Sequence, residues 1–285
     1  MKTIVVERWD KLNQILYVGS WKENLQRFRS DFAYRGLSST RHDLQTSLMR
    51  LGDNSADLEQ HLLRAFRRYA YRYASFADSL WNWLALAQHH GLPTRLLDFT
   101  YSPYVALHFA TANPAHEHED ALVWCVDYVR GIQFLPDRLK SILRDEGASV
   151  FTAEMLSSGA QSLPAFGRLA DAPFVAFFEP PSFDDRIVNQ FALFALMSQA
   201  TTRLDDWLQD HDELAFQVLI PAALKGEVRD KLDQANITER VLLPGLDGLS
   251  AWLARYYRPR KKLAGNSESE AKPTVRGTTL DPDSR

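Results

Sequence analysis

The order of two hydrophobic periodicities along this 285-residue chain limits the folds that it can adopt. From Leu58 to Phe76, apolar side chains recur at helical spacing, which predicts an amphipathic helix. Further on, runs rich in β-branched and aromatic residues predict strands, at residues 121–128, 174–178 and 214–220. Because helices come first and strands with a few intervening helices follow, the sequence favours an α+β fold over a regular βαβ series.

Capping residues, glycine and proline mark the ends of the expected helices. A second helix is expected over residues 79–90, because Gly91 ends it. A short extended run over 95–99 follows, and Ser102-Pro103 then joins a capping hydroxyl to a proline at the first helical position. Later helices are expected at 222–234 and 246–257, and the apolar run 187–197 fits either a strand or a buried helix.

A single domain is expected over residues 1–263, with a disordered polar tail over 264–285. The tail contains too few large apolar side chains to offset the entropy that ordering would cost. Hydrophobic residues make up 45% of the chain and charged residues 24%, which excludes wholesale disorder.

Charge and cysteine content narrow the classes of function. The formal net charge is −3, so bulk charge gives no indication of nucleic-acid binding, although a local basic groove is compatible with it. Cys125 is the single cysteine, which excludes an internal disulfide and a Cys-based zinc site. No window approaches the roughly 18 apolar residues of a membrane span. We therefore expect a cytoplasmic protein without a membrane partner and without a metal.

Two segments are dense in polar groups, and Tyr34-Arg35-Gly36 is the first. An arginine between an aromatic residue and a glycine at a strand end is well placed to bind an anion. The guanidinium offers phosphate a two-pronged contact, and the glycine lets a ligand approach the backbone. An arginine that pairs with a carboxylate beneath a tight turn explains the same residues equally well.

The second segment runs from Gln88 to Pro103 and forms a helix–loop–strand–helix corner. Free N–H groups at the helix that begins after Ser102 would attract a phosphate or a carboxylate. A buried structural corner, in which Arg95 pairs with Asp98 while Thr100 and Ser102 act as caps, accounts for the same residues equally well.

These segments resemble the FRG domain family, which takes its name from an aromatic-Arg-Gly motif. The matching pieces are Tyr34-Arg35-Gly36 and the run from Trp83 to Ala110, which contains Gln-His-His-Gly-Leu-Pro-Thr-Arg-Leu-Leu-Asp-Phe-Thr. Later matches are Arg186, Gln190 and the run from Leu243 to Leu249, so that the resemblance spans most of residues 30–255. Family members are mostly bacterial or phage-borne, and some occur near defence functions.

A weaker resemblance is to ADP-ribosyltransferases, and it implies a mixed or split β-sheet core with an N-terminal helical elaboration. In their arginine class, an aromatic-Arg pair ends the first core strand and holds the NAD diphosphate. The run from Thr100 to Ala110 is similar to their second element, and the run from Phe216 to Pro221 to their third. Gln217 stands where the third element has its catalytic glutamate.

The resemblance implies a pocket for NAD or another nucleotide. We expect Arg35 to point into a cleft shared with residues 95–102 and to grip the diphosphate, while Tyr34 or Tyr101 stacks on a ring. The residues implied to bind the ligand are Tyr34, Arg35, His89, His90, Thr94, Arg95, Asp98, Thr100, Ser102 and Arg186. The catalytic candidates are Gln190, Gln217 and Glu213. Because a glutamine supplies no negative charge to an oxocarbenium-like transition state, NAD binding is better supported than transfer.

Two classes of function therefore remain open. The first is a nucleotide-binding protein, either a divergent ADP-ribosyltransferase or an NAD-cleaving effector, with NAD as its ligand or substrate and no tightly bound cofactor. The second is a non-catalytic sensor or partner-binding module of a defence or toxin system.

Overall fold

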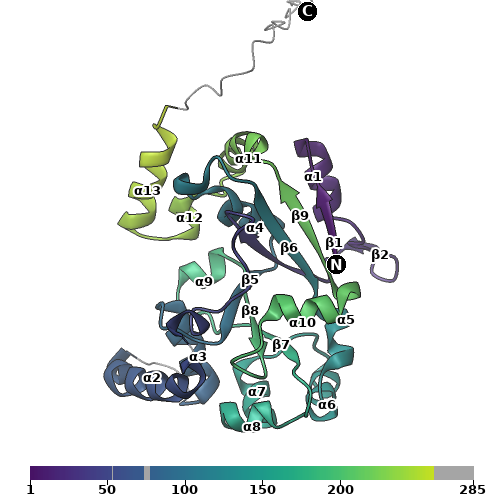
Figure 1. Ribbon diagram of the computed structural model, residues 1–285, viewed down its shortest axis with the longest axis vertical. Coiled ribbons are helices and arrows are strands. Elements are labelled where there is room, and N and C mark those ends of the chain that lie inside the picture. Colours follow the sequence, from purple (N-terminus) through teal and green to yellow (C-terminus); the bar gives the residue numbers. More distant parts are fainter. Residues whose placement is uncertain (53, 74–77, 260–285) are drawn as a thin grey trace, which may run out of the picture.

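A computed structural model describes residues 1–52, 54–73 and 78–259 (Figure 1). Within them, a seven-stranded mixed sheet has the order β1-β9-β6-β4-β5-β8-β7. β1 runs parallel to β9, and the other neighbouring strands are antiparallel. The strands are β1 (Lys2–Val5), β4 (Phe32–Leu37), β5 (Leu96–Thr100), β6 (Ala121–Asp127), β7 (Val175–Phe178), β8 (Ala192–Met197) and β9 (Ala215–Ile220), with β2 (Trp21–Lys22) and β3 (Arg27–Phe28) in a separate hairpin. The expected α+β class is confirmed.

Helices surround this sheet. The α-helices are α1 (Trp9–Leu16), α2 (Ser55–Ala70), α3 (Leu80–His89), α4 (Pro103–Thr111), α5 (Tyr128–Gly131), α6 (Asp137–Asp145), α7 (Ala153–Gly159), α8 (Leu163–Gly167), α9 (Asp185–Asn189), α10 (Leu204–Asp210), α11 (Ala222–Gln234), α12 (Glu239–Leu242) and α13 (Leu246–Tyr256). Short 3₁₀ turns are η1 (Met49–Leu51), η2 (Tyr71–Tyr73), η3 (Pro114–His116), η4 (Ile132–Phe134) and η5 (Asp212–Leu214).

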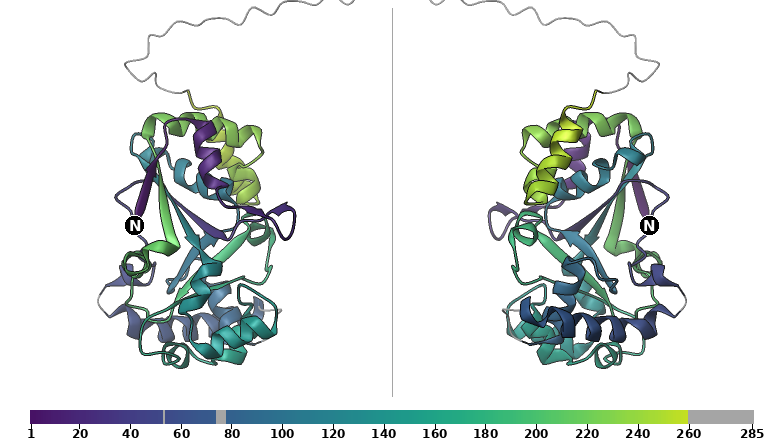
Figure 2. Two further views of the ribbon diagram at one scale, coloured as in Figure 1. Left: turned by 90° about the vertical axis from the view of Figure 1, so that its right-hand side faces the viewer. Right: turned by 90° about the vertical axis from the view of Figure 1, so that its left-hand side faces the viewer.

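The helices form two groups on one face of the sheet. Tyr34 of β4 and Val123 of β6 belong to a core with residues of α1, α4 and α11. Leu96 of β5 and Phe178 of β7 belong to a second core with residues of α3, α7 and α8. Figure 2 shows α1, α11 and α13 at one end of the long axis and α2, α3 and α6 to α8 at the other. The opposite face packs on α10 through Trp207.

The sheet is weakly joined between its two halves. β4 and β6 align residue by residue from Phe32 to Leu37, whereas β4 and β5 share the single pair Tyr34 and Thr100. Beyond that pair, no ladder connects the two strands within the described residues. A mixed sheet with a split between β4 and β5 is therefore present, and the split lies beside the two polar segments.

The sequence places many of these elements correctly, but residues 187–197 are neither one strand nor one helix. α9 ends at Asn189, Phe191 turns the chain with φ of +47°, and β8 begins at Ala192. The apolar pattern that starts at Leu58 lies in α2, which begins at Ser55, next to the expected cap positions Asn54 and Ser55, and passes into η2 at Tyr71. The end of that pattern, at residues 74–77, lies outside the described residues. The expected tail at 264–285 lies outside the described residues.

Candidate functional site

A cleft of about 470 Å³ opens where α3 meets β5. Separate segments of the chain contribute its walls: the loop after β4, the end of α3, β5 and α9. Its lining residues are Ser47, Gln88, His89, His90, Gly91, Leu92, Asp98 and Arg186. The cleft therefore gathers histidine, carboxylate and guanidinium groups from His89 to Arg186, together with Ser47, which lies nearly 140 positions before Arg186.

Local capping explains why the end of α3 lines this cleft. Ser79 caps the start of the helix and accepts a hydrogen bond from the Asn82 main chain. At the other end, Gly91 takes φ of +79°, a left-handed conformation that favours glycine, and the Leu92 amide returns to Ala87 O at 2.9 Å. The chain turns sharply there and enters β5, which brings the last turn of α3 beside that strand.

Gln88 and Asp98 form a two-pronged contact in the cleft. Gln88 Nε2 donates to both carboxylate oxygens of Asp98, at 3.0 and 3.1 Å. Thr94 Oγ1 donates to Gln88 Oε1 at 2.5 Å and so fixes the orientation of the amide. The Asp98 side chain nevertheless remains 64% exposed, which leaves its carboxylate open to a ligand.

Arg35 crosses the split between β4 and β5. Its Nη1 donates to the main-chain oxygen of Asp98 at 2.5 Å and lies 3.9 Å from Asp98 Oδ2. Burial lowers the pKa of Arg35; Asp98 opposes that change and Arg50 adds to it. Arg35 Nε is buried without a partner among the described residues. Arg35 thus meets the 95–102 corner as expected, but it does not line the cleft.

Arg95 is part of the scaffold, which corrects its expected role in binding a ligand. Its guanidinium is buried and pairs with Glu59 of α2, with Nε 2.8 Å and Nη2 2.5 Å from Glu59 Oε2. Nη1 donates to Ser198 O at 2.9 Å. The structural interpretation of the corner paired Arg95 with Asp98, but the observed partner, Glu59, lies 36 positions away in the sequence and shares no local signal with Arg95.

Tyr34 packs in the core of the protein, and Gly36 packs against α4. This corrects the expectations that Tyr34 stacks on a ligand ring and that Gly36 lets a ligand approach the backbone. Tyr34 is 1% exposed and donates through its hydroxyl to Leu16 O at 2.8 Å, so its ring has no access to a ligand. Gly36 lies against α4, where an added Cβ would be 1.9 Å from Ala106 O. Close helix packing, rather than ligand approach, therefore requires this glycine. Tyr101 donates to Glu179 and does not line the cleft.

Three hydroxyls of the corner stabilise the backbone. Thr94 is buried and accepts from the Leu96 amide at 3.1 Å. Thr100 Oγ1 donates to Gln190 O at 2.7 Å and accepts from the Ser102 amide at 3.0 Å. Ser102 Oγ caps α4 by accepting from the Val105 amide at 3.3 Å. These contacts agree with the structural interpretation of the corner, in which Thr100 and Ser102 act as caps.

The two histidines of the cleft differ in their surroundings. His89 Nε2 lies 2.6 Å from Asp184 Oδ2, an acid that sequence analysis missed although it caps α9. Burial raises the pKa of Asp184, but hydrogen bonds from His89 and the α9 backbone outweigh it and lower the value. His90 is exposed, and burial together with the neighbouring His89 lowers its pKa. His90 is therefore neutral at pH 7 and can accept a proton.

The catalytic candidates do not assemble, which corrects that expectation. Gln190 Nε2 donates to Leu242 O at 2.8 Å. Gln217 of β9 accepts from Thr3 of β1, and β6 and β4 lie between β9 and β5. Glu213 lies in η5, just before β9. Adjacent strands are about 4.8 Å apart, so Gln217 and Glu213 are well separated from the cleft.

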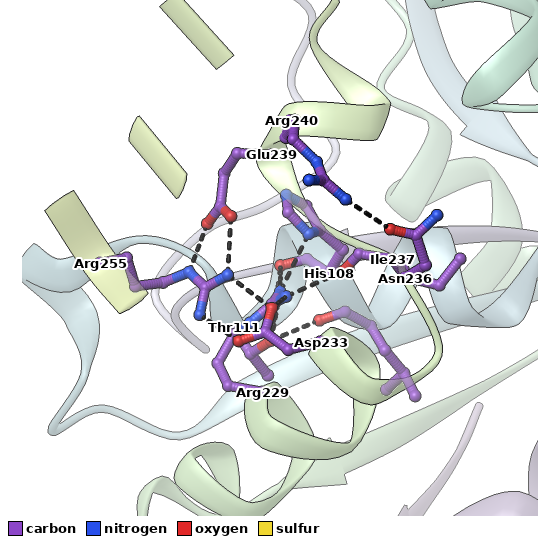
Figure 3. A network of polar contacts seen from close by, with 10 residues as sticks. His108, Thr111, Arg229, Asp233, Asn236, Ile237, Glu239, Arg240 and Arg255 are labelled. Carbon is purple, nitrogen blue, oxygen red and sulfur yellow. Dashed lines mark hydrogen bonds and ion pairs between the residues drawn. The ribbon is translucent and has the colours of Figure 1, made fainter. Parts of the chain in front are cut away.

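A larger cavity of about 1040 Å³ lies between α4, α11 and α13 and shares no lining residue with the cleft. Figure 3 shows that three charged groups of its lining, Arg229, Asp233 and Arg255, form a network with His108 and Glu239. Arg255 Nη2 lies 2.6 Å from Asp233 Oδ1 and Arg255 Nε the same distance from Glu239 Oε1, while Arg229 Nη1 donates to His108 Nδ1 at 3.0 Å. We therefore assign the smaller cleft, not this cavity, as the candidate site.

Residues 1–52, 54–73 and 78–259 contain neither a cluster of metal-ligating side chains nor a membrane-spanning helix. No three histidine, cysteine or acidic side chains come together there in a group that could hold a metal ion. None of the helices in that part of the chain is long and apolar enough to cross a membrane.

Comparison with known proteins identifies the segment that carries the cleft. Residues 30–119 match the family model of the FRG domain. They contain β4, α2, α3, β5 and α4, and they supply each lining residue of the cleft except Arg186. No curated protein and no solved structure matches the chain.

Proposed function

We propose that the FRG domain of this chain, at residues 30–119, forms with Arg186 a pocket for a nucleotide of the NAD or ADP-ribose class. The observation that supports this is the cleft, which gathers a guanidinium, two imidazoles and an exposed carboxylate. Its volume of about 470 Å³ falls within the range of small-molecule pockets.

Arg186 and Arg35 supply the positive charge that a diphosphate requires. Arg186 is exposed in the wall of the cleft, where its planar guanidinium can contact two phosphate oxygens. Arg35 sits beside Asp98, is partly exposed, and adds positive potential from the split in the sheet. In this proposal, therefore, Arg186 contacts the diphosphate directly and Arg35 holds Asp98.

Any glycosidic cleavage at this cleft would use Asp98. Its carboxylate carries the negative charge that Gln190 and Gln217 lack, and Gln88 holds it in one orientation. A fixed negative charge stabilises an oxocarbenium-like transition state. This supports a divergent ADP-ribosyltransferase or NAD-cleaving reaction in which the acid comes from β5 instead of β9.

The second candidate function is a non-catalytic sensor that binds the nucleotide alone. This candidate is favoured because several motif residues stabilise the fold and do not face a ligand. Examples are Thr94, Arg95 and Thr100, which are all buried and hydrogen-bonded. Under this alternative, Asp98 would orient the ligand by accepting hydrogen bonds from its ribose.

Titration calorimetry of the full chain with NAD and with ADP-ribose tests the proposal. Binding by the parent protein, and its loss in Arg186→Gln and Asp98→Asn, would support the pocket. Arg35→Lys should weaken binding more than it lowers the melting temperature. Arg144→Gln, an exposed arginine on α6, serves as the matched control and should bind normally.

Nicotinamide release, measured with NAD as the substrate, separates the two candidates. Release that disappears in Asp98→Asn would support the enzyme, and binding without release would support the sensor. If neither nucleotide binds the parent protein, the nucleotide pocket is wrong.

A further inference from the structure

The second half of α2 and the following turn η2 present an unusually basic and aromatic surface. Residues 60–73 contain four arginines and three tyrosines and no acidic residue. The chain as a whole carries a formal net charge of −3, so positive charge is concentrated locally here. We call this surface the α2 patch; its members are Arg64, Arg67, Arg68, Tyr69, Tyr71, Arg72 and Tyr73.

Three arginines of α2 and η2 face solvent. α2 buries Glu59 and Leu63 against the fold, while Arg64, Arg68 and Arg72 are exposed. Residues four apart lie on the same face of a helix, about 6 Å apart along its axis. Arg64 and Arg68 therefore lie on one face of α2, and Arg72 continues this row in η2, at the edge of the molecule where Figure 1 places α2 apart from the sheet.

Two arginines of the α2 patch contact tyrosines: Arg68 donates to the Tyr69 hydroxyl and Arg72 to the Tyr73 hydroxyl. Within the described residues, Arg67 pairs with Asp78 at 2.6 Å, and no ion pair occupies Arg64, Arg68 or Arg72. Arg68 instead lies 4.5 Å from the centroid of the Tyr69 ring, and Arg72 has the same relation to Tyr73 at 4.6 Å. An external anion would therefore displace no salt bridge from the row.

The tyrosines add flat faces beside the charges. Tyr69, Tyr71 and Tyr73 are exposed, at 71%, 70% and 68%. A tyrosine packed in the core would be far less exposed. A guanidinium group lies over the Tyr69 ring, and another lies over the Tyr73 ring. Alternating guanidinium groups and aromatic faces are the combination on which single-stranded nucleic acids bind, by phosphate contact and by base stacking.

We infer that the α2 patch binds single-stranded nucleic acid, with Arg64, Arg68 and Arg72 on successive phosphates and Tyr69 and Tyr73 stacked on bases. An anionic membrane is a poorer match, because an interfacial helix buries an apolar face of tryptophan, phenylalanine or leucine in the lipid, whereas α2 buries Leu63 against the fold. An acidic protein would use the charges but would leave the stacking faces without a role. This surface is distinct from the nucleotide cleft and does not depend on it.

Fluorescence anisotropy of the full chain with a fluorescein-labelled oligothymidine of about 15 nucleotides tests the inference, since single-strand sites are of this order. The triple variant R64Q/R68Q/R72Q should bind more weakly. On a single strand each phosphate contact contributes about 0.7 to the slope of log affinity against log salt, so the slope should become shallower by about 2. The control R27Q/R144Q/R168Q removes the same charge from exposed arginines elsewhere and should leave affinity and slope unchanged.

The double variant Y69A/Y73A tests stacking separately, because it leaves the net charge unaltered. It should lower affinity roughly fivefold or more, the effect of losing base–aromatic stacking. Its melting temperature should match that of the parent, since both rings are exposed.

Three results would overturn the inference. The first is no binding of the oligonucleotide by the parent protein. The second is an equal loss of affinity in the control and the triple variant. The third is preferential binding of phosphatidylserine vesicles or polyglutamate over the oligonucleotide, which would assign the patch to a membrane or to an acidic protein.

Discussion

Glu59 of α2 and Arg95 at the start of β5 form a buried ion pair whose side chains are 2% and 9% exposed. Arg95 Nε lies 3.0 and 2.8 Å from the two carboxylate oxygens, and the Arg95 amide also donates to Glu59. The remaining nitrogen, Nη1, donates to Ser198 O. The pair therefore joins α2, β5 and the segment after β8, and it fixes the strand that carries Asp98.

Breaking this pair should destabilise the protein strongly. Glu59→Gln removes the negative charge and leaves the Arg95 guanidinium buried without compensation, which typically costs about 3–5 kcal/mol. Urea denaturation monitored by tryptophan fluorescence measures the free energy of unfolding. Glu146→Gln, at an exposed site after α6, is the control and should change it by less than about 0.5 kcal/mol. Equal stability of the two variants would contradict the role of the pair.

Gly36→Ala should disrupt the packing of α4 on β4. The new methyl group would lie 1.9 Å from Ala106 O and 2.7 Å from Ala110 N, and main-chain atoms cannot move aside as a flexible side chain can. We expect a loss of about 3 kcal/mol or more in the free energy of unfolding.

Gly131→Ala provides a matched control for the glycine substitution. Gly131 is helical, with φ of −57°, and nothing lies within 4 Å of its would-be Cβ. Its replacement should therefore be neutral or slightly stabilising, by up to about 1 kcal/mol. Normal stability of Gly36→Ala would show that the motif glycine serves another purpose.

His108 should make stability depend on pH. Burial, reinforced by the nearby charge of Arg229, lowers the pKa of His108 to about 4 from an ordinary value of 6.5. The unfolded chain therefore binds a proton at a higher pH than the folded chain does. The contribution of His108 to the free energy of unfolding is fully present above pH 6.5. It is lost as the pH falls towards 4, which lowers the free energy of unfolding by up to roughly 3 kcal/mol.

The variant His108→Asn isolates this contribution from that of other titrating groups. Its amide oxygen can accept the hydrogen bond that Arg229 Nη1 donates to His108 Nδ1, but it does not titrate. The free energy of unfolding, measured by urea denaturation between pH 7 and 4.5, should fall less steeply in this variant than in the parent. His61→Asn, at an exposed position of α2, should retain the parent's pH dependence. An unchanged slope in His108→Asn would contradict the prediction.

Cys125 should not react with thiol reagents while the protein is folded. Cys125 is wholly buried in β6, so a thiol reagent cannot reach it. Burial also raises the pKa of the thiol, so the reactive thiolate does not form. In native buffer, Ellman's reagent should react with Cys125 only as fast as the protein unfolds. In denaturant, the reagent should release its chromophore at once. Rapid reaction of the native protein would show that this side of the sheet opens readily.

Local signals in the sequence identified much of the helix and strand content. Ser79, Gly91 and Ser102 act on backbone groups within a few positions, and each ends or begins an element as expected. By contrast, β1 carries no local pattern long enough to recognise, because its four residues pair with β9 more than two hundred positions away. The turn at Phe191 was missed because a non-glycine residue seldom adopts a positive φ.

The sequence by itself determined the polar corner and its motif, because neighbouring residues there fold into one helix end, one turn and one strand. Tertiary structure decided which of those polar groups are free. It paired Arg95 with Glu59, buried Tyr34, and left Asp98 exposed beside Gln88 and Arg35. It also placed Gln217 and Glu213 away from the cleft, since sheet order depends on long-range pairing that no local spacing encodes.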